Sequence, residues 1–180
     1  GLYGGTFDPI HNGHIHVICE LISRKIVDHL LVLPAGQPRL RDYKPHATGA
    51  QRRTMCQLAI NELPSEIKKC VEVNPIEVLR EGPSYTIDTV EAVAQNYAGD
   101  TIVLIVGTDA YEKIDQWHRA DELKKLVEFV VIDRPEFPGQ HNTSVDAIAV
   151  SATEIRAHKS DAVPAAVAAY IKEHNLYGSK

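Results

Sequence analysis

The feature that most constrains the fold of this chain is the alternation of short apolar, β-branched runs with amphipathic stretches. Such runs, when bounded by glycine, proline or charged residues, are typical of strands buried in a parallel sheet. They lie at residues 30–33, 71–73, 101–106 and 127–132, and a further strand is indicated before Gly4. The alternation predicts the α/β class, with a doubly wound, mostly parallel sheet, right-handed crossovers and helices on both faces.

The stretches between the apolar runs have the apolar spacing of helices. We expect helices over residues 13–25, 51–62, 85–96 and 165–174. Two irregular stretches, 36–49 and 134–142, are too short for interdomain linkers and have a length that is often functional. No repeat or low-complexity segment divides the chain, so we expect residues 1–180 to form a single domain.

Composition argues against several classes of protein. Acidic residues outnumber basic ones by 24 to 19, and the net charge of −5 argues against coating of nucleic acid or of a membrane surface. No apolar stretch is long enough to span a bilayer, and no secretion signal is visible. Three cysteines without a CxxC pair favour a reducing cytoplasm. Residues 36–53 nevertheless hold five basic residues and one acidic residue, a small basic loop suited to a phosphate site.

The most informative segment runs from Gly4 to His14, between a predicted strand and a predicted helix. Glycines allow the backbone to approach a ligand closely, and the N–H groups that begin a helix favour an anion. His11 and His14 are three residues apart, so one helical turn places both on one face, where they can donate to a phosphate. Asp8 is most simply a turn or capping residue.

Other interpretations of this loop are weaker. It lacks the lysine of a Walker A loop and the GxGxxG spacing of a dinucleotide fingerprint. Two histidines without a third ligand make a poor zinc site. Taken alone, however, the histidines equally fit a glycine-rich turn with two exposed side chains.

A second segment follows the strand-like apolar run 147–150. Ser151 or Thr153 can cap a helix there, which leaves N–H groups available to an anion. Arg156 lies one turn beyond Thr153 and adds a planar charged group suited to phosphate. Taken alone, this pattern also fits a plain helix cap with a solvated arginine.

The middle of the chain offers three further candidates. Asp109 follows the strongest predicted strand, where an acid can bind ribose hydroxyls or cap a helix. Trp117, the only tryptophan, is by default a core residue, but its polar neighbours also suit stacking on a ring. Residues 83–89, PSYTIDT, are typical of the entry into a helix.

Residues 4–14 resemble the GxFxPxHxGH signature of the HxGH nucleotidyltransferase superfamily, and residues 150–156 resemble its second signature, ISSTxxR. Ala152 stands where the second signature has another serine. The resemblance implies a Rossmann-like fold in which His11 and His14 contact the phosphates of ATP and stabilise the transition state.

The PSYT-D-T segment, the GTD at 107–109 followed by Trp117, and Arg134-Pro135 resemble the bacterial nicotinate-nucleotide adenylyltransferase branch of that superfamily. This implies that Trp117 and Thr86 hold a nicotinate ring and that Asp109 meets the ATP ribose. The branch usually has a compact PPHK-like segment after its second strand, whereas here the basic and histidine elements, Lys44 and His46, are rearranged.

The resemblance implies Mg²⁺-dependent transfer of AMP from ATP to nicotinate mononucleotide in NAD biosynthesis, which gives deamido-NAD and pyrophosphate. Alternatives are nicotinamide mononucleotide or phosphopantetheine as the acceptor, or a non-catalytic nucleotide-binding module. We expect small-molecule substrates and neither nucleic acid nor membrane as a partner. The sequence leaves open whether the chain forms a homo-oligomer. It also leaves open the selectivity for nicotinate over nicotinamide mononucleotide.

The expected site has three groups of residues. The catalytic residues are His11, His14 and Arg156. The ATP-binding residues are these three together with Gly4, Gly5, Thr6, Phe7, Gly107, Asp109, Arg134, Ser151 and Thr153. The mononucleotide-binding residues are Lys44, His46, Arg52, Tyr85, Thr86 and Trp117. We expect no metal bound by protein side chains.

Overall fold

The computed structural model describes residues 1–36, 44–133, 145 and 148–179, and its centre is a parallel sheet. Five strands lie in the order β3-β2-β1-β4-β5, and every neighbouring pair is parallel. The strands are β1 (Leu2–Gly5), β2 (Leu30–Pro34), β3 (Val71–Val73), β4 (Val103–Gly107) and β5 (Glu128–Ile132). These five strands confirm the runs predicted before Gly4 and at residues 30–33, 71–73, 101–106 and 127–132 to within about two residues at their ends, the usual scatter of such boundaries.

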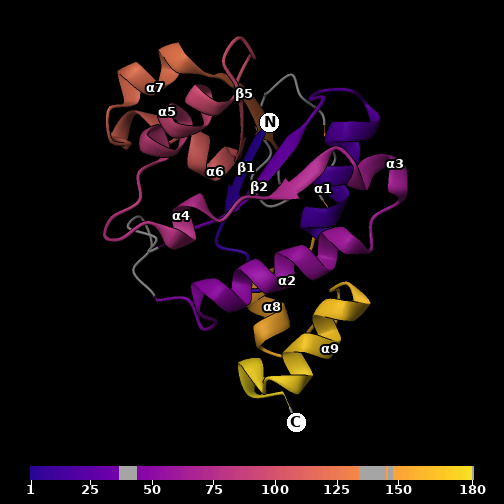
Figure 1. Cartoon of the computed structure of the whole chain (residues 1–180). Coiled ribbons are helices and arrows are strands. Elements are labelled where there is room, and N and C mark those ends of the chain that lie inside the picture. The colour runs from indigo at the N-terminus through magenta and orange to yellow at the C-terminus, as the bar shows by residue number, and fades with distance from the viewer. Residues whose placement is uncertain (37–43, 134–144, 146–147, 180) are drawn as a thin grey trace.

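The helices join these strands in the expected alternation (Figure 1). The α-helices are α1 (Asn12–Ser23), α2 (Gly49–Asn61), α3 (Ser65–Lys68), α4 (Ile76–Leu79), α5 (Thr86–Asn96), α6 (Thr108–Tyr111), α7 (Ala120–Leu126), α8 (Ala152–Arg156) and α9 (Ala165–Glu173). Two short 3₁₀ helices are η1 (Ile114–Gln116) and η2 (Leu176–Gly178). The four predicted helices correspond to α1, α2, α5 and α9.

Two apolar layers cover the two faces of the sheet, because side chains alternate along each strand. On β2, Val32 belongs to the layer that holds α1, α2 and α9, whereas Leu31 and Leu33 belong to the layer that holds α5 and α7. With both faces covered, the central strands β2 and β4 are apolar along their whole length rather than alternating with polar residues. The doubly wound architecture is thereby confirmed.

The strand-like run at 147–150 is the prediction that the structure corrects. Residue 147 lies outside the described residues, and Ile148 to Val150 are irregular, with a short turn from the Val150 N–H to the Ile148 carbonyl (2.8 Å). These residues pair with none of the described strands. They border a cavity instead, and Ile148 stays 47% exposed, so their apolar character reflects that position.

The order of the strands reverses at the centre of the sheet. From β1 the chain winds outward to β2 and β3, and it then returns to β4 on the other side of β1. The carboxyl ends of β1 and β4, at Gly5 and Gly107, therefore flank the point at which open α/β sheets bind ligands. No helix within the described ranges is both long and apolar enough to cross a membrane.

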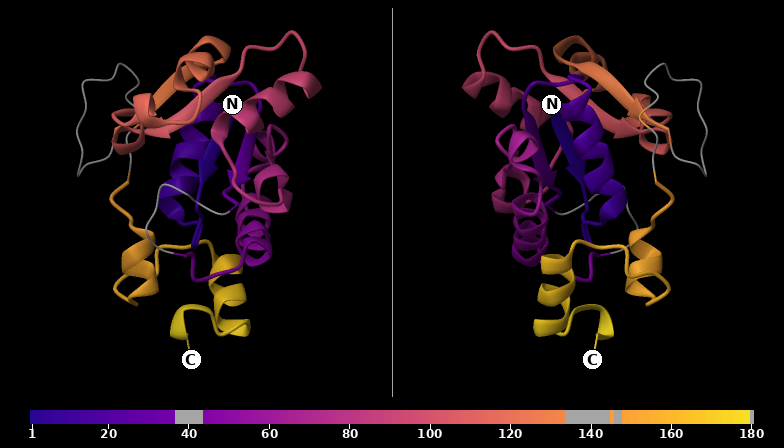
Figure 2. Two further views of the ribbon diagram at one scale, coloured as in Figure 1. Left: turned by 90° about the vertical axis from the view of Figure 1, so that its left-hand side faces the viewer. Right: turned by 90° about the vertical axis from the view of Figure 1, so that its right-hand side faces the viewer.

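The last helices of the chain lie together at one end of the molecule, as the two side views show (Figure 2). Helix α9 packs against α2, where the main-chain N–H of Ala166 donates to the Glu62 carboxylate (2.6 Å). The C-terminal part of the chain is thus tied to a helix that enters the fold directly after β2.

Candidate active site

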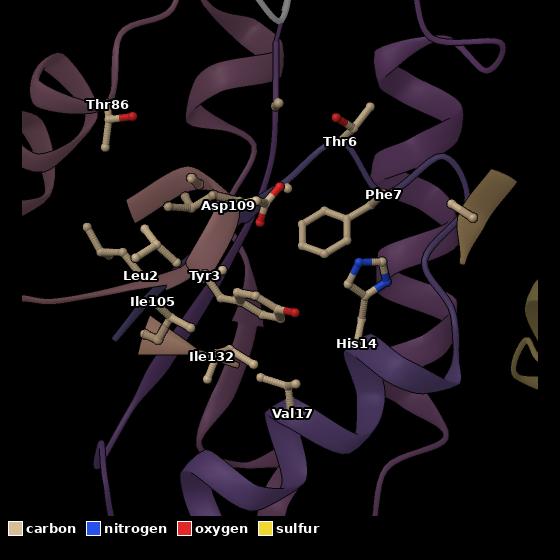
Figure 3. A pocket seen from close by; sticks show the side chains of 18 of the residues that line it. Leu2, Tyr3, Thr6, Phe7, His14, Val17, Thr86, Ile105, Asp109 and Ile132 are labelled. Carbon is tan, nitrogen blue, oxygen red and sulfur yellow. The ribbon is translucent and has the colours of Figure 1, made fainter. Parts of the chain in front are cut away.

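A cavity of about 710 Å³ opens where the strand order reverses. Its size falls in the range of small-ligand sites. Its wall combines the loop from β1 to α1, the end of β4 with α6, the start of α5, and the start of α8. In Figure 3, Phe7 and His14 lie together on the side that α1 borders, and Thr86 lies on the opposite side.

The loop that leaves β1 turns sharply and brings two histidine rings together. Phe7 has a positive φ of 49°, and its ring packs so closely on Gly5 that a Cβ there would lie 2.8 Å from it. His11 forms the N-cap of α1, and its ring stacks on that of His14 with 3.7 Å between the ring centroids. The predicted common face for the two histidines is therefore present.

The hydrogen bonding of His14 indicates where its proton lies. The His11 main-chain N–H donates to Nδ1 of His14 (3.2 Å), so Nδ1 acts as an acceptor. A neutral imidazole that accepts at Nδ1 carries its proton on Nε2. His14 also lies in the cavity wall, packed edge-to-face on Phe7, so this ring is oriented as a donor at the start of a helix.

The segment at α8 folds onto the same loop. Ser151 caps α8 by accepting from the Thr153 N–H (3.2 Å), as the sequence predicts. Arg156 donates to the Thr153 hydroxyl (3.1 Å) and to the main-chain carbonyl of Asp8 (2.7 Å). The two segments that resemble family signatures, 148 residues apart at this contact, are therefore joined directly.

The end of β4 supplies another part of the wall. Gly107 caps the short helix α6, and Asp109 in its first turn borders the cavity. The buried hydroxyl of Thr108 donates to the Asp133 carboxylate (2.8 Å). This bond fixes the end of β4 to the end of β5 and so fixes the backbone that carries Asp109.

Aromatic and hydroxyl side chains form the far end of the cavity. Tyr85 and Thr86 stand at the start of α5, and Trp117 follows η1. Trp117 is half-buried against the second apolar layer and also borders the cavity, so it is partly a core residue, and its stacking on a ligand ring stays a prediction. The Tyr85 ring stacks on His118, with centroids 4.2 Å apart.

A polar network behind this end was not found from the sequence. The Thr89 hydroxyl donates to Glu77 (3.0 Å), and Arg80 donates to both Thr89 (3.1 Å) and Ser84 (2.7 Å). Burial raises the pKa of Glu77, and the Thr89 hydrogen bond and the charge of Arg80 oppose that rise. The only signal in the sequence is Thr89 itself, a polar residue on the apolar face of α5, which requires a buried partner.

The structure does not bring every predicted site residue into the cavity wall. Lys44 and His46 are exposed and lie outside it, and Arg134 lies outside the described residues. Arg52, which is also predicted to bind the mononucleotide, lies outside the cavity wall too and is only 2% exposed. Its guanidinium donates to four main-chain carbonyls instead: Thr6 (2.7 Å), Ala35 (2.7 Å), Gly36 (3.3 Å) and Ala47 (3.3 Å).

Asp8 is a second buried charge that the sequence interpretation undervalued. It is 2% exposed, and its carboxylate accepts from the main-chain N–H groups of His46 (2.8 Å) and Ala47 (3.0 Å) and from the Tyr177 hydroxyl (2.7 Å). These partners are 38 to 169 residues away in the chain, so local spacing contains no signal for them. Asp8 is thus a junction between segments rather than a simple turn residue.

Comparison with known proteins gives full-length matches. The cytidylyltransferase-like family matches residues 2–158. A probable nicotinate-nucleotide adenylyltransferase of Bacillus pumilus is 35% identical over 190 residues, and the nicotinate-nucleotide adenylyltransferase of Bacillus subtilis is 34% identical over 190 residues. Each alignment covers 99% of this chain and 98% of the relative.

Solved structures share the fold. The Plasmodium falciparum nicotinic acid mononucleotide adenylyltransferase complexed with NaAD superposes with a TM-score of 0.81 at 19% identity, over 99% of this chain and 97% of that one. A putative nicotinate-nucleotide adenylyltransferase from Vibrio parahaemolyticus gives a TM-score of 0.71 at 18% identity, over 99% and 94%. The predicted Rossmann-like fold is confirmed by these similarities.

The buried guanidinium of Arg52 predicts a large effect on stability. Arg52→Met removes the donors of four carbonyls and a buried positive charge that faces Asp8, so we expect a loss of about 3 to 5 kcal/mol in the free energy of unfolding. Urea titration measures it. The matched control is Arg53→Met at the exposed neighbouring position, which should change stability by less than about 0.5 kcal/mol. Equal stability of the two variants would contradict this role.

The raised pKa of Glu77 predicts a pH-dependent effect. The folded state holds the Glu77 proton more tightly than the unfolded chain does, so the stability from this group is present at low pH and is lost as the pH rises through the folded pKa. Glu77→Gln, which stays neutral, should therefore resist urea better than wild type near about pH 7.5, and this advantage should shrink toward about pH 4.5. Exposed Glu81→Gln is the control, and an advantage that grows on acidification would refute the sign.

Proposed function

This chain belongs to the cytidylyltransferase-like family and, within it, to the nicotinate-nucleotide adenylyltransferases, and from that premise we propose that it transfers the adenylyl group of ATP to nicotinate mononucleotide. The products are deamido-NAD and pyrophosphate, and the reaction belongs to NAD biosynthesis. The observation that carries the proposal is one cavity whose wall holds His14 and Arg156 together with Thr86 and Trp117, and Figure 3 shows His14 and Thr86 on opposite sides of it.

The reaction is an in-line substitution at the α-phosphorus of ATP. A phosphate oxygen of the mononucleotide forms the new P–O bond, and the bond to the β-phosphate breaks with its electron pair going to pyrophosphate. A phosphate monoester is already anionic near neutral pH, so the step needs neither a general base nor a covalent enzyme intermediate. Catalysis then depends on positioning the substrates and on stabilising the charge of the leaving group.

The phosphate end has the chemistry for that task. We assign His14 the role of donor to the phosphates through Nε2, with His11 stacked beside it. Arg156, held by Thr153 and by the Asp8 carbonyl, adds a permanent positive charge. Gly4 to Phe7 and Ser151 complete the ATP end, and Gly107 with Asp109 serves the ribose.

The acceptor end is assigned to Tyr85, Thr86 and Trp117. We propose that Arg52 supports the loops after β1 and β2 and does not contact the mononucleotide, because its guanidinium already donates to main-chain carbonyls there. Contacts of Lys44 and His46 with the mononucleotide and of Arg134 with ATP stay predictions. We further propose that residues 1–180 act as one catalytic domain in the cytoplasm.

Nucleotidyltransferases of this family typically use a divalent metal, and we propose that Mg²⁺ arrives as part of the substrate, Mg·ATP. The described residues contain no group of three His, Cys, Asp or Glu side chains that could hold a metal ion. Carried by the triphosphate, the cation would lower the charge of the leaving group.

A pyrophosphate-release assay with ATP and a panel of acceptors tests the proposed function. We expect turnover with nicotinate mononucleotide, much slower turnover with nicotinamide mononucleotide and with phosphopantetheine, and loss of activity on chelation of Mg²⁺ that added Mg²⁺ restores. Equal rates with the acid and the amide would contradict the acceptor assignment. Binding of ATP without pyrophosphate release from any acceptor would support a non-catalytic module instead.

His14→Ala tests the phosphate end. Loss of one preorganised donor should lower kcat by about 10²- to 10³-fold, with a much smaller change in ATP affinity. His16→Ala is the matched control, because His16 is also half-buried on α1 but lies outside the cavity wall. Its kcat should stay at the wild-type value. A wild-type kcat for His14→Ala would remove His14 from the mechanism.

A further inference from the structure

We propose that Tyr177, near the C-terminal end of the described chain, is a positioning residue for adenylyl transfer. It acts through the buried carboxylate of Asp8 on the loop between β1 and α1, residues 6–11, which we call the phosphate loop. The inference rests on the proposed function and concerns a residue that is absent from both family signatures and from the cavity wall. Its basis is a hydrogen bond from the Tyr177 hydroxyl to Oδ1 of Asp8 (2.7 Å), between residues 169 positions apart.

The Asp8 residue holds both halves of the phosphate-binding end. Its carbonyl accepts from Arg156 (2.7 Å), and three residues further along the chain His11 begins α1. A displacement of the Asp8 backbone would therefore move Arg156 and His11 together. Because in-line transfer depends on the alignment of reacting atoms, a shift of this kind acts on the reaction rate.

The C-terminal part of the chain forms hydrogen bonds at two points, with this loop and with the first residue of α1. Tyr177 holds Asp8 at one end, and the carbonyl of Ala162 accepts from the Asn12 N–H (2.9 Å) at the other. The segment between these two contacts contains His11. His11, which stacks on His14, is thus carried by a short loop whose two ends are fixed by residues from the last fifth of the sequence.

Tyr177 is itself held in place. Its carbonyl lies 2.9 Å from Nε2 of His158, its backbone has a left-handed φ of 58°, and its ring meets that of His46 edge-on. Burial and the bond to Asp8 raise the pKa of Tyr177, so the hydroxyl keeps its proton and donates throughout the neutral range. The donor is therefore fixed in both position and protonation state.

Removal of this one donor has a defined consequence. The Asp8 carboxylate would keep the main-chain N–H groups of His46 and Ala47 but would lose its contact with the C-terminal segment. The side of Asp8 that faces Tyr177 would then be held only by packing. We expect the loop to sample displaced positions while the fold, which rests on two separate apolar layers, persists.

Tyr177→Phe tests the proposal, because it removes the hydroxyl and keeps the ring. We expect kcat to fall on the order of 10-fold, since small misalignments at a transfer site are costly. The Kd for Mg·ATP, measured by titration calorimetry, should rise by about 5-fold, the equivalent of one net hydrogen bond. The KM for the acceptor should stay near wild type, because Tyr177→Phe keeps the ring that meets His46 and because Thr86 lies on the opposite side of the cavity from His14 (Figure 3).

The control is Tyr170→Phe on α9, a half-buried tyrosine of the same C-terminal part whose ring stacks on His174 away from the cavity. It should leave both kcat and Kd unchanged. A purely destabilising effect of Tyr177→Phe would reduce the binding stoichiometry without changing Kd, so calorimetry separates a structural role from a positioning role. Wild-type kcat and Kd in Tyr177→Phe would overturn the proposal.

A double-mutant cycle with Asp8→Asn identifies the route of action. If Tyr177 acts through Asp8, the double variant should lose little more activity than the more severe single variant. Additive losses would overturn the proposal. Calorimetry with Mg·ATP needs no acceptor, so it can be carried out whether or not the reaction proceeds. A wild-type protein that binds ATP but does not release pyrophosphate would refute the proposed function. The effect of Tyr177→Phe on the Kd for Mg·ATP would still decide this inference.

Discussion

Two buried charges of opposite sign organise the carboxyl edge of the sheet, and the candidate site depends on them. Chain segments that leave a sheet at its centre cannot pair their main-chain groups with neighbouring strands, yet such groups need partners when buried. Arg52 serves the carbonyls of Thr6, Ala35 and Ala47, whereas Asp8 serves the N–H groups of His46 and Ala47. In the loops that follow β1 and β2, Arg52 thus supplies the hydrogen-bond donors and Asp8 supplies the acceptors.

The sheet and the phosphate loop could be predicted from sequence because their signals are local. Burial on both faces makes β2 and β4 continuously apolar, and the segment from the end of β1 to the start of α1 holds Gly5, on which the Phe7 ring packs, and both histidines within a few residues. Helix α7 was not predicted, because its sequence ADELKKL has only a narrow apolar stripe, of which Leu123 is fully buried.

The supporting parts of the site could not be predicted, because their partners are distant in the chain. Arg52 stands in a run of polar residues beside the exposed Arg53, and nothing nearby distinguishes the two. The same holds for Asp8, whose partners reach as far as Tyr177, and for Glu77, which meets Thr89 only once α4 and α5 have packed. Sequence spacing located the side chains in the cavity wall better than it located the residues that hold this wall in place.

The start of α1 is capped by an uncommon pair of side chains. Helices usually begin with a hydroxyl, amide or carboxylate side chain and with acidic residues in the first turn, which offset the partial positive charge of the helix end. Helix α1 begins with His11 and has no acidic residue in that turn. The two histidines form the capping box themselves, and Nδ1 of His14 accepts from the main-chain N–H of His11. The ring that we assign as a phosphate donor is therefore also part of the helix cap, so one side chain serves both the stability of α1 and the proposed reaction.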